Sequence, residues 1–177
     1  MIPRTTLAPG LEISRVLTGL WQVADIERID LAPGLNISRA LTGLWQIADM
    51  ERDGRSLDLE QTADAMQPYV DAGLTAFDMA DHYGSAEEIA GIYRRDVAPN
   101  GDVQCLTKWV PEPGPVSEAD VAAALDRACT RLATDRLDLL QFHAWTFADP
   151  RWLDALWLLE AARDAGRIGA IGATNFA

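Results

Sequence analysis

The chain has 177 residues, of which 49% are hydrophobic and 24% are charged, an ordinary composition for one soluble globular domain with its own core. Acidic residues outnumber basic residues 27 to 15 and no basic stripe is present, so we expect no nucleic-acid partner. The N-terminus lacks an apolar signal core, and no segment approaches the ~18 apolar residues that span a bilayer. These features predict a cytoplasmic protein without membrane contact.

The first feature along the chain is an internal repeat. Residues 7–28 recur as residues 31–52, with 18 of 22 positions identical. Solenoids need at least three copies, so the pattern indicates a tandem duplication or a cloning scar. Each copy is predicted to form a glycine-turned β-hairpin followed by a strand, at 31–39 and 40–45 in the second copy. Only the second copy continues into a helix, so we expect a peripheral segment 1–30 and one domain over 31–177.

The rest of the chain alternates between helices and strands. Apolar runs predict strands, and amphipathic stretches with capping residues predict the helices between them. The predicted strands after residue 45 are 74–80, 103–109, 137–143 and 168–174. Strands that alternate with helices at roughly thirty-residue spacing indicate a parallel sheet.

Capping side chains mark the start of each of the main helices. They are Asp58, Ser85, Ser117 and Asp149. Glu88 lies three residues after Ser85, which is the pattern of a capping box. Pro68 lies inside the helix that follows Asp58 and is expected to kink it. Cys105 and Cys129 lack the spacing of metal ligands, so we expect buried thiols and no metal site.

Polar residues lie at the C-terminal end of one predicted strand after another. They are Asp78, Lys108, His143, Thr174 and Asn175. An open dinucleotide-binding sheet would carry G-x-G-x-x-G after its first strand, and this chain does not. A TIM barrel builds its site from residues at successive strand ends. The pattern therefore favours a (β/α)8 barrel of which this chain supplies about the first five strands, preceded by the hairpin in two copies.

Lys108 is the strongest single candidate, because it is the only lysine beside fourteen arginines. Its place in an apolar strand suggests a need for a compact ammonium, and a buried ammonium needs a partner, for which Asp78 is the nearest candidate. The other candidates each have a structural alternative. Asp78 could cap a turn, Tyr83 could be an amphipathic core residue, and His143 could be a hydrogen-bonded core histidine. His82 is expected to be a solvated loop residue.

Four stretches together resemble the aldo-keto reductase family: GLTAFDMADHYGSAEEIAG, LTKWV, DLLQFHAW and IGAIGATNF, in family order. The resemblance implies a (β/α)8 barrel that reduces small-molecule aldehydes and ketones with NADPH or NADH. It places the catalytic residues at Asp78, Tyr83, Lys108 and His143. It also implies that the nicotinamide is lined by Gly43, Leu44 and Trp45 and bound by Asp78, Thr174 and Asn175.

The chemistry implied by this resemblance gives each catalytic residue a role. Hydride transfer to a carbonyl carbon leaves charge on the oxygen, so a proton donor must lie within hydrogen-bond reach. Tyr83 would be that general acid, and the Lys108 ammonium would favour the phenolate that remains. Asp78 would hold Lys108 charged and in place, while His143 would orient the carbonyl.

The length of the chain leaves a second hypothesis open. A complete barrel has eight strands and about 250 residues, whereas five strands are expected here. The chain could instead be a non-catalytic half-barrel remnant or an interaction module that pairs through open sheet edges. We expect the 177-residue chain alone to show no measurable carbonyl reduction. The substrate, the choice between NADPH and NADH, and the oligomeric state stay open.

Overall fold

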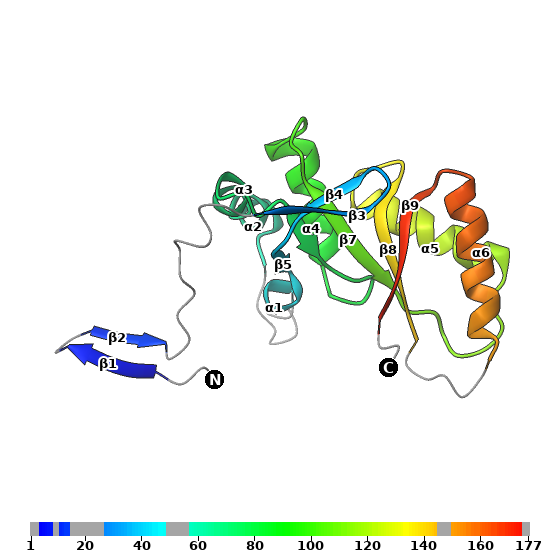
Figure 1. Ribbon diagram of the computed structural model, residues 1–177, viewed down its shortest axis with the longest axis horizontal. Helices are drawn as coiled ribbons and strands as arrows, with labels where there is room; N and C mark the ends of the chain where they lie inside the picture. The colour runs from blue at the N-terminus through cyan, green and yellow to red at the C-terminus, as the bar shows by residue number, and fades with distance from the viewer. Residues whose placement is uncertain (1–3, 9–10, 15–26, 49–56, 145–149, 175–177) are drawn as a thin grey trace.

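The computed structural model describes residues 4–8, 11–14, 27–48, 57–144 and 150–174, with main chain only for the first two segments (Figure 1). Its centre is a sheet of five strands in the order β5-β6-β7-β8-β9, and every neighbouring pair is parallel. The strands are β5 (Leu41–Gly43), β6 (Ala76–Asp78), β7 (Gln104–Trp109), β8 (Leu137–His143) and β9 (Ile168–Thr174). Strand order follows chain order, as at the start of a (β/α)8 barrel. This confirms the predicted fold class.

Helices connect the strands and cover one side of the sheet (Figure 1). The larger core cluster lies between them and includes Phe77, Leu140 and Phe142 from the sheet and Ile89, Leu125 and Leu159 from the helices. The helices are α1 (Trp45–Ala48), α2 (Leu59–Asp64), α3 (Gln67–Asp71), α4 (Ala86–Ile92), α5 (Glu118–Arg131) and α6 (Trp152–Asp164), and a π-helical segment (Tyr93–Val97) continues α4. Within the described part of the chain, no helix is long and apolar enough to cross a membrane.

The predicted boundaries of β8 and β9 agree with the structure, and other boundaries differ. The strand predicted at 40–45 ends at Gly43, and Trp45 instead begins α1. The helix after Asp58 is split into α2 and α3, which fits the predicted kink. Pro68 lies in the first turn of α3, where its missing N–H has no helical partner to lose.

Two helix caps form as predicted and one does not. Asp58 accepts a hydrogen bond from the main-chain N–H of Gln61 at 2.9 Å, and Ser117 forms a capping box with Asp120. The capping box predicted at Ser85 is wrong. Helix α4 does begin after Ser85, but ψ of Ser85 is 14° rather than extended, and its side chain makes no capping bond. The prediction for Asp149 lies outside the described residues.

The second copy of the repeat forms a hairpin that packs on the sheet near the N-terminal ends of its strands. Strands β3 (Arg28–Ala32) and β4 (Leu35–Ser38) are antiparallel, and their turn uses Gly34 at φ 75°, where a side chain would be strained. Leu35 and Ile37 are buried in a smaller apolar cluster whose sheet residues are Ala76, Leu106, Leu139 and Ala170. This hairpin therefore covers the face of the sheet opposite the helices.

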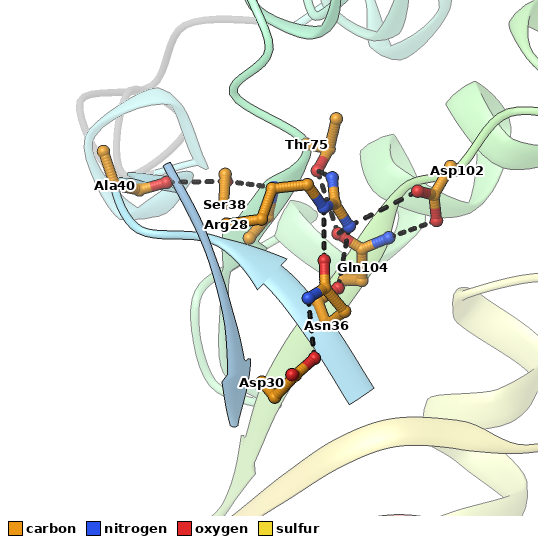
Figure 2. A network of polar contacts seen from close by, with 9 residues as sticks. Arg28, Asp30, Asn36, Ser38, Ala40, Thr75, Asp102 and Gln104 are labelled. Carbon is orange, nitrogen blue, oxygen red and sulfur yellow. Dashed lines mark hydrogen bonds and ion pairs between the residues drawn. The ribbon is translucent and has the colours of Figure 1, made fainter. Parts of the chain in front are cut away.

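Arg28 fixes the hairpin to the starts of the neighbouring strands (Figure 2). Its guanidinium donates to the Thr75 hydroxyl at 2.8 Å and to the Asn36 main-chain carbonyl at 2.8 Å, and it pairs with Asp102 at 3.3 Å. Asn36 in turn donates to Asp30 at 2.7 Å. The network joins the hairpin to the segments that lead into β6 and β7.

The first copy of the repeat also forms two antiparallel strands, β1 (Arg4–Ala8) and β2 (Leu11–Ser14). Its main-chain pairing of Arg4 with Ser14 matches the pairing of Arg28 with Ser38 in the second copy. The first strand of the parallel sheet, β5, comes from the second copy. The equivalent residues of the first copy, 17–19, lie outside the described residues.

Candidate functional site

Strand alternation brings the predicted polar residues to one face of the sheet. Asp78 follows Ala76 by two residues and Lys108 follows Leu106 by two, so each shares a face with an apolar residue that contacts the hairpin. The apolar residues lie nearer the strand starts and the polar ones at the C-terminal ends. The inner face thus has an apolar end under the hairpin and a polar end at the opposite edge.

Asp78 and Lys108 form a direct ion pair between adjacent strands. The Lys108 ammonium lies 2.7 Å from each carboxylate oxygen of Asp78 and 2.9 Å from the main-chain carbonyl of Met79. These three contacts match the three N–H donors of an ammonium. The Lys108 side chain is only 8% exposed. The lysine is therefore buried, paired and fixed in direction, as its lone occurrence in the sequence suggested.

Tyr83 lies against this pair, on the turn between β6 and α4. The Lys108 ammonium is 4.9 Å from the centre of the Tyr83 ring, within cation–π distance. Because the ammonium directs its N–H groups at Asp78 and Met79, it influences Tyr83 through its charge rather than through a hydrogen bond. The Tyr83 ring also lies 6.2 Å from that of Trp45, so aromatic faces flank the site.

His143 completes the predicted group and brings an unpredicted histidine with it. His143, at the end of β8, is 6% exposed, and its ring lies 6.0 Å from that of His82. His82 also packs edge-on against Tyr83 at 4.8 Å, and its Nδ1 lies 2.9 Å from an oxygen of Asp81. His82 does lie on a turn, as predicted, and its side chain is 32% exposed, but the prediction missed its packing against Tyr83 and His143.

Several charges and burial act together on His143. Burial lowers the pKa of His143 below its ordinary value, and electrostatic interactions with His82 and Lys108 lower it further. The Asp81 carboxylate opposes them weakly. The imidazole is thus held in its neutral form near pH 7, in which it can donate one hydrogen bond and accept another.

Gln141 is a site residue that the sequence prediction missed. It lies on β8 two residues before His143, and so on the same face. Its amide nitrogen donates to Asp78 at 3.3 Å, and its amide oxygen accepts from the Thr174 hydroxyl at 2.9 Å. The available signal was this two-residue spacing from a candidate histidine. Asn175, the other predicted cofactor residue on this strand, lies outside the described residues.

The three first-strand candidates lie in different environments. Gly43 is in register with Asp78, and the main-chain N–H of Leu44 donates to the Asp78 carbonyl at 3.0 Å. The Leu44 side chain is 1% exposed and packs in the core, so only its main chain could face a ligand. Trp45 is 46% exposed and offers an indole face beside Tyr83.

An open cavity of about 600 Å³ lies beside the turn that follows β6, and among the described site residues only His82 lines it. It lies between the turn that carries Asp81 and His82 and the loop of residues 110–116 that follows β7. Trp109 also lines it and packs edge-on against Phe142 in the core. A small molecule in this cavity would lie next to the turn that carries Tyr83.

A buried ion pair between α4 and α5 holds the turn that carries Tyr83. Glu87, on α4, is 1% exposed, and its carboxylate accepts from the Thr107 hydroxyl at 2.6 Å and pairs with Arg131 at 3.1 Å. Arg131 also donates to the main-chain carbonyl of Asp81 at 3.1 Å. One guanidinium thereby connects α5, α4 and the turn ahead of Tyr83.

Neither cysteine takes part in the site. Cys105 and Cys129 are buried, as predicted, and burial raises the pKa of the Cys105 thiol to about 12. A thiol with so high a pKa is a poor nucleophile at neutral pH. Across the described ranges, no group of His, Cys, Asp or Glu side chains is arranged to bind a metal ion.

Comparison with known proteins gives one consistent relationship. The model of the aldo/keto reductase family matches residues 41–177. A curated aldo-keto reductase from Mycolicibacterium smegmatis is 29% identical over 177 residues, which cover 99% of this chain and 51% of that protein.

Solved structures show the same likeness. A structure from Pseudomonas aeruginosa described as an aldo-keto reductase is 27% identical, with a TM-score of 0.64 over 83% of this chain and 58% of that one. An aldo-keto reductase from Klebsiella pneumoniae in complex with NADPH is 22% identical, with a TM-score of 0.68 over 86% and 50% of the two chains. The chain thus spans between 50% and 58% of the length of these relatives.

Proposed function

This chain belongs to the aldo/keto reductase family, and on that premise we propose that it supplies the catalytic residues of a reductase that converts aldehydes or ketones to alcohols with NADPH or NADH. The observation that carries the proposal is the buried Lys108 ammonium, held by Asp78 and lying 4.9 Å from the Tyr83 ring. A purely structural ion pair would not need a tyrosine and two histidines packed around it at the same edge of the sheet.

Tyr83 is proposed as the general acid. The carbonyl oxygen gains negative charge as hydride reaches the carbon, and the Tyr83 hydroxyl donates its proton to that oxygen. Tyr83 then carries a phenolate, which the nearby Lys108 charge stabilises. Asp78 holds the Lys108 ammonium in place beside Tyr83 through contacts of 2.7 Å to both carboxylate oxygens.

His143 is proposed to orient the substrate. A neutral imidazole can donate a hydrogen bond to the carbonyl oxygen without competing with Tyr83 for the proton transfer. The burial and electrostatic interactions that lower the pKa of His143 favour this neutral form. His82 contributes to that environment and, through Asp81, helps fix the turn that carries Tyr83.

The residues present fit a nicotinamide cofactor. Trp45 offers an exposed flat face, and Thr174 offers a hydroxyl at the same edge of the sheet as Asp78 and Lys108. The main chain of Gly43 and Leu44 lies beside Asp78. These residues, with Asn175 by its place in the sequence, are proposed to hold the nicotinamide ring and its carboxamide. When bound, the cofactor supplies the hydride.

The proposal is tested in a completed barrel, because the chain spans about half of its relatives. Residues 41–177 are joined to the remainder of the Mycolicibacterium smegmatis protein, and a cooperative thermal melt establishes that the fusion folds. We expect NADPH oxidation with 4-nitrobenzaldehyde, and a fall in kcat by a factor on the order of 10² or more in Tyr83→Phe, the scale of losing general-acid assistance. A folded fusion without activity, or with full activity after Tyr83→Phe, would contradict the proposal.

A further inference from the structure

Gln141 links two residues of the site on different strands, Asp78 on β6 and Thr174 on β9. Its amide lies between the Asp78 carboxylate at 3.3 Å and the Thr174 hydroxyl at 2.9 Å. Asp78 is also the partner of Lys108. Gln141 therefore connects the ion pair on β6 and β7 to the end of β9.

The chemistry of these groups fixes the direction of both hydrogen bonds. An ionised carboxylate only accepts hydrogen bonds, so the Gln141 NH₂ group must face Asp78. The Gln141 amide oxygen then faces Thr174 and can only accept. The Thr174 hydroxyl hydrogen is consequently directed at Gln141, and among the described residues no donor takes up the lone pairs of that hydroxyl oxygen. Thr174 is set as an acceptor for any ligand at the strand end.

We propose that Gln141 is a positioning residue that makes Thr174 select for an N–H donor, the carboxamide NH₂ of a nicotinamide cofactor. This inference rests on the proposed cofactor use and adds the residue that sets Thr174's preference. In Gln141→Leu, the Thr174 hydroxyl can rotate and offer either its hydrogen or a lone pair. The site then loses its selectivity for the carboxamide but keeps its fold, since leucine fills a similar volume.

The hydrogen-bond chain itself is tested first, by NMR of the full 177-residue chain. The Gln141 side-chain amide signals are identified by their loss in Gln141→Leu. We expect Thr174→Val to shift them and Thr174→Ser, which keeps the hydroxyl, to leave them near their original positions. Thr130→Val is the matched control, because Thr130 is exposed on α5 and distant in the fold. If the chemical shifts of the Gln141 side-chain amide do not change in Thr174→Val, the chain of hydrogen bonds does not exist.

The effect on selectivity is tested with two probes, NADPH and its reduced 3-acetylpyridine analogue, which carries a methyl group in place of the amide NH₂. Binding to the same chain is followed by chemical shifts at up to millimolar ligand. We expect the intact chain to prefer NADPH by about tenfold, the equivalent of one net hydrogen bond. Thr174→Val should abolish the preference by lowering the affinity for NADPH alone. Gln141→Leu should narrow the preference by raising the affinity for the analogue, because the freed Thr174 hydroxyl can then donate to the acetyl oxygen, and the double variant should behave like Thr174→Val.

Three outcomes separate this inference from the proposed function. Gln141→Leu that lowers the affinity for both probes equally, as general damage would, overturns the inference. Preference retained in Gln141→Leu overturns it too, while the proposed cofactor use survives. If neither probe binds the 177-residue chain, both are titrated into the folded fusion, where absence of binding overturns the proposed cofactor use and with it the selective role of Gln141. Gln61→Leu, an exposed glutamine on α2, is the matched control and should change neither affinity.

Discussion

Glu87 and Arg131 form an ion pair in which the carboxylate is almost fully buried and the guanidinium reaches on to the carbonyl of Asp81. The pair couples the stability of the helical layer to the geometry of the turn that carries Tyr83. A buried carboxylate that loses its charge leaves the opposing guanidinium uncompensated. The effect of breaking the Glu87–Arg131 pair on stability can be measured separately from the effect of breaking the Asp78–Lys108 pair.

Glu87→Gln should lower the free energy of unfolding by about 3 kcal/mol, the scale for removing one partner of a buried pair. Urea unfolding of the full chain measures the loss. Glu88→Gln is the matched control, because Glu88 is 43% exposed and only 3.5 Å from Arg131. It should cost less than about 0.5 kcal/mol. Similar losses in the two variants would contradict a special role for the buried contact.

The duplicated segment offers an internal control for the hairpin. Arg28→Ala removes the contacts to Thr75, Asn36 and Asp102 and should destabilise the chain by about 1–2 kcal/mol (Figure 2). Arg4→Ala is the same change at the equivalent position of the first copy and should have an effect within about 0.5 kcal/mol. Thermal or urea unfolding compares them. Equal losses would show that both copies contribute equally to the fold.

The pKa of His143 predicts the direction of a pH effect on stability. Because its pKa is lowered in the folded state, the unfolded chain binds a proton more readily at this position. The contribution of neutral His143 is therefore complete above its unfolded pKa of about 6.5 and declines as the pH falls through that value toward the folded pKa.

His143→Gln should remove this part of the pH dependence. The free energy of unfolding is measured from pH 8 to pH 5 for the original chain and the variant. Relative to the variant, the original chain should lose stability as the pH falls. The same pH series is measured for His82→Gln as a comparison, because the ring of His82 lies beside that of His143. Parallel curves for the original chain and His143→Gln would contradict the predicted direction.

The sequence predicted the parallel sheet and the Asp78–Lys108 pair because each leaves a local signal. Apolar runs between capped helices set the strands, and a single lysine in an apolar run requires a partner. Ser85 was misjudged because the Ser-x-x-Glu pattern describes residue types and not the backbone angle at the cap, which here is set by the tight turn before α4. Glu88 pairs with Arg131 instead.

His82 and Gln141 were missed because their roles depend on contacts between distant segments. A histidine on a turn carries no periodicity that places it over a strand end 61 residues later. Gln141 shares a face with His143, but its partners on β6 and β9 follow only from strand order. Long-range register, rather than local propensity, decides these positions.

Replacing Lys108 is the most direct way to tell whether the Asp78–Lys108 pair belongs to a catalytic site or is only structural. If Lys108 only pairs with Asp78, arginine should replace it, because a guanidinium keeps the charge and binds a carboxylate well. If its compact ammonium acts on Tyr83, the larger planar group places the charge elsewhere. Lys108→Arg and Tyr83→Phe would then disable the same unit. Their losses of activity should not add, so the double variant should be hardly less active than either single one.

The deciding measurement is the steady-state rate of the completed barrel carrying Lys108→Arg, with saturating NADPH and 4-nitrobenzaldehyde. We predict that kcat falls by a factor on the order of 10² or more, while the dissociation constant for NADPH and the melting temperature change little. Near-normal turnover in Lys108→Arg, in a fusion that Tyr83→Phe inactivates, would contradict the proposed action of Lys108 on Tyr83 and leave the lysine with a structural role.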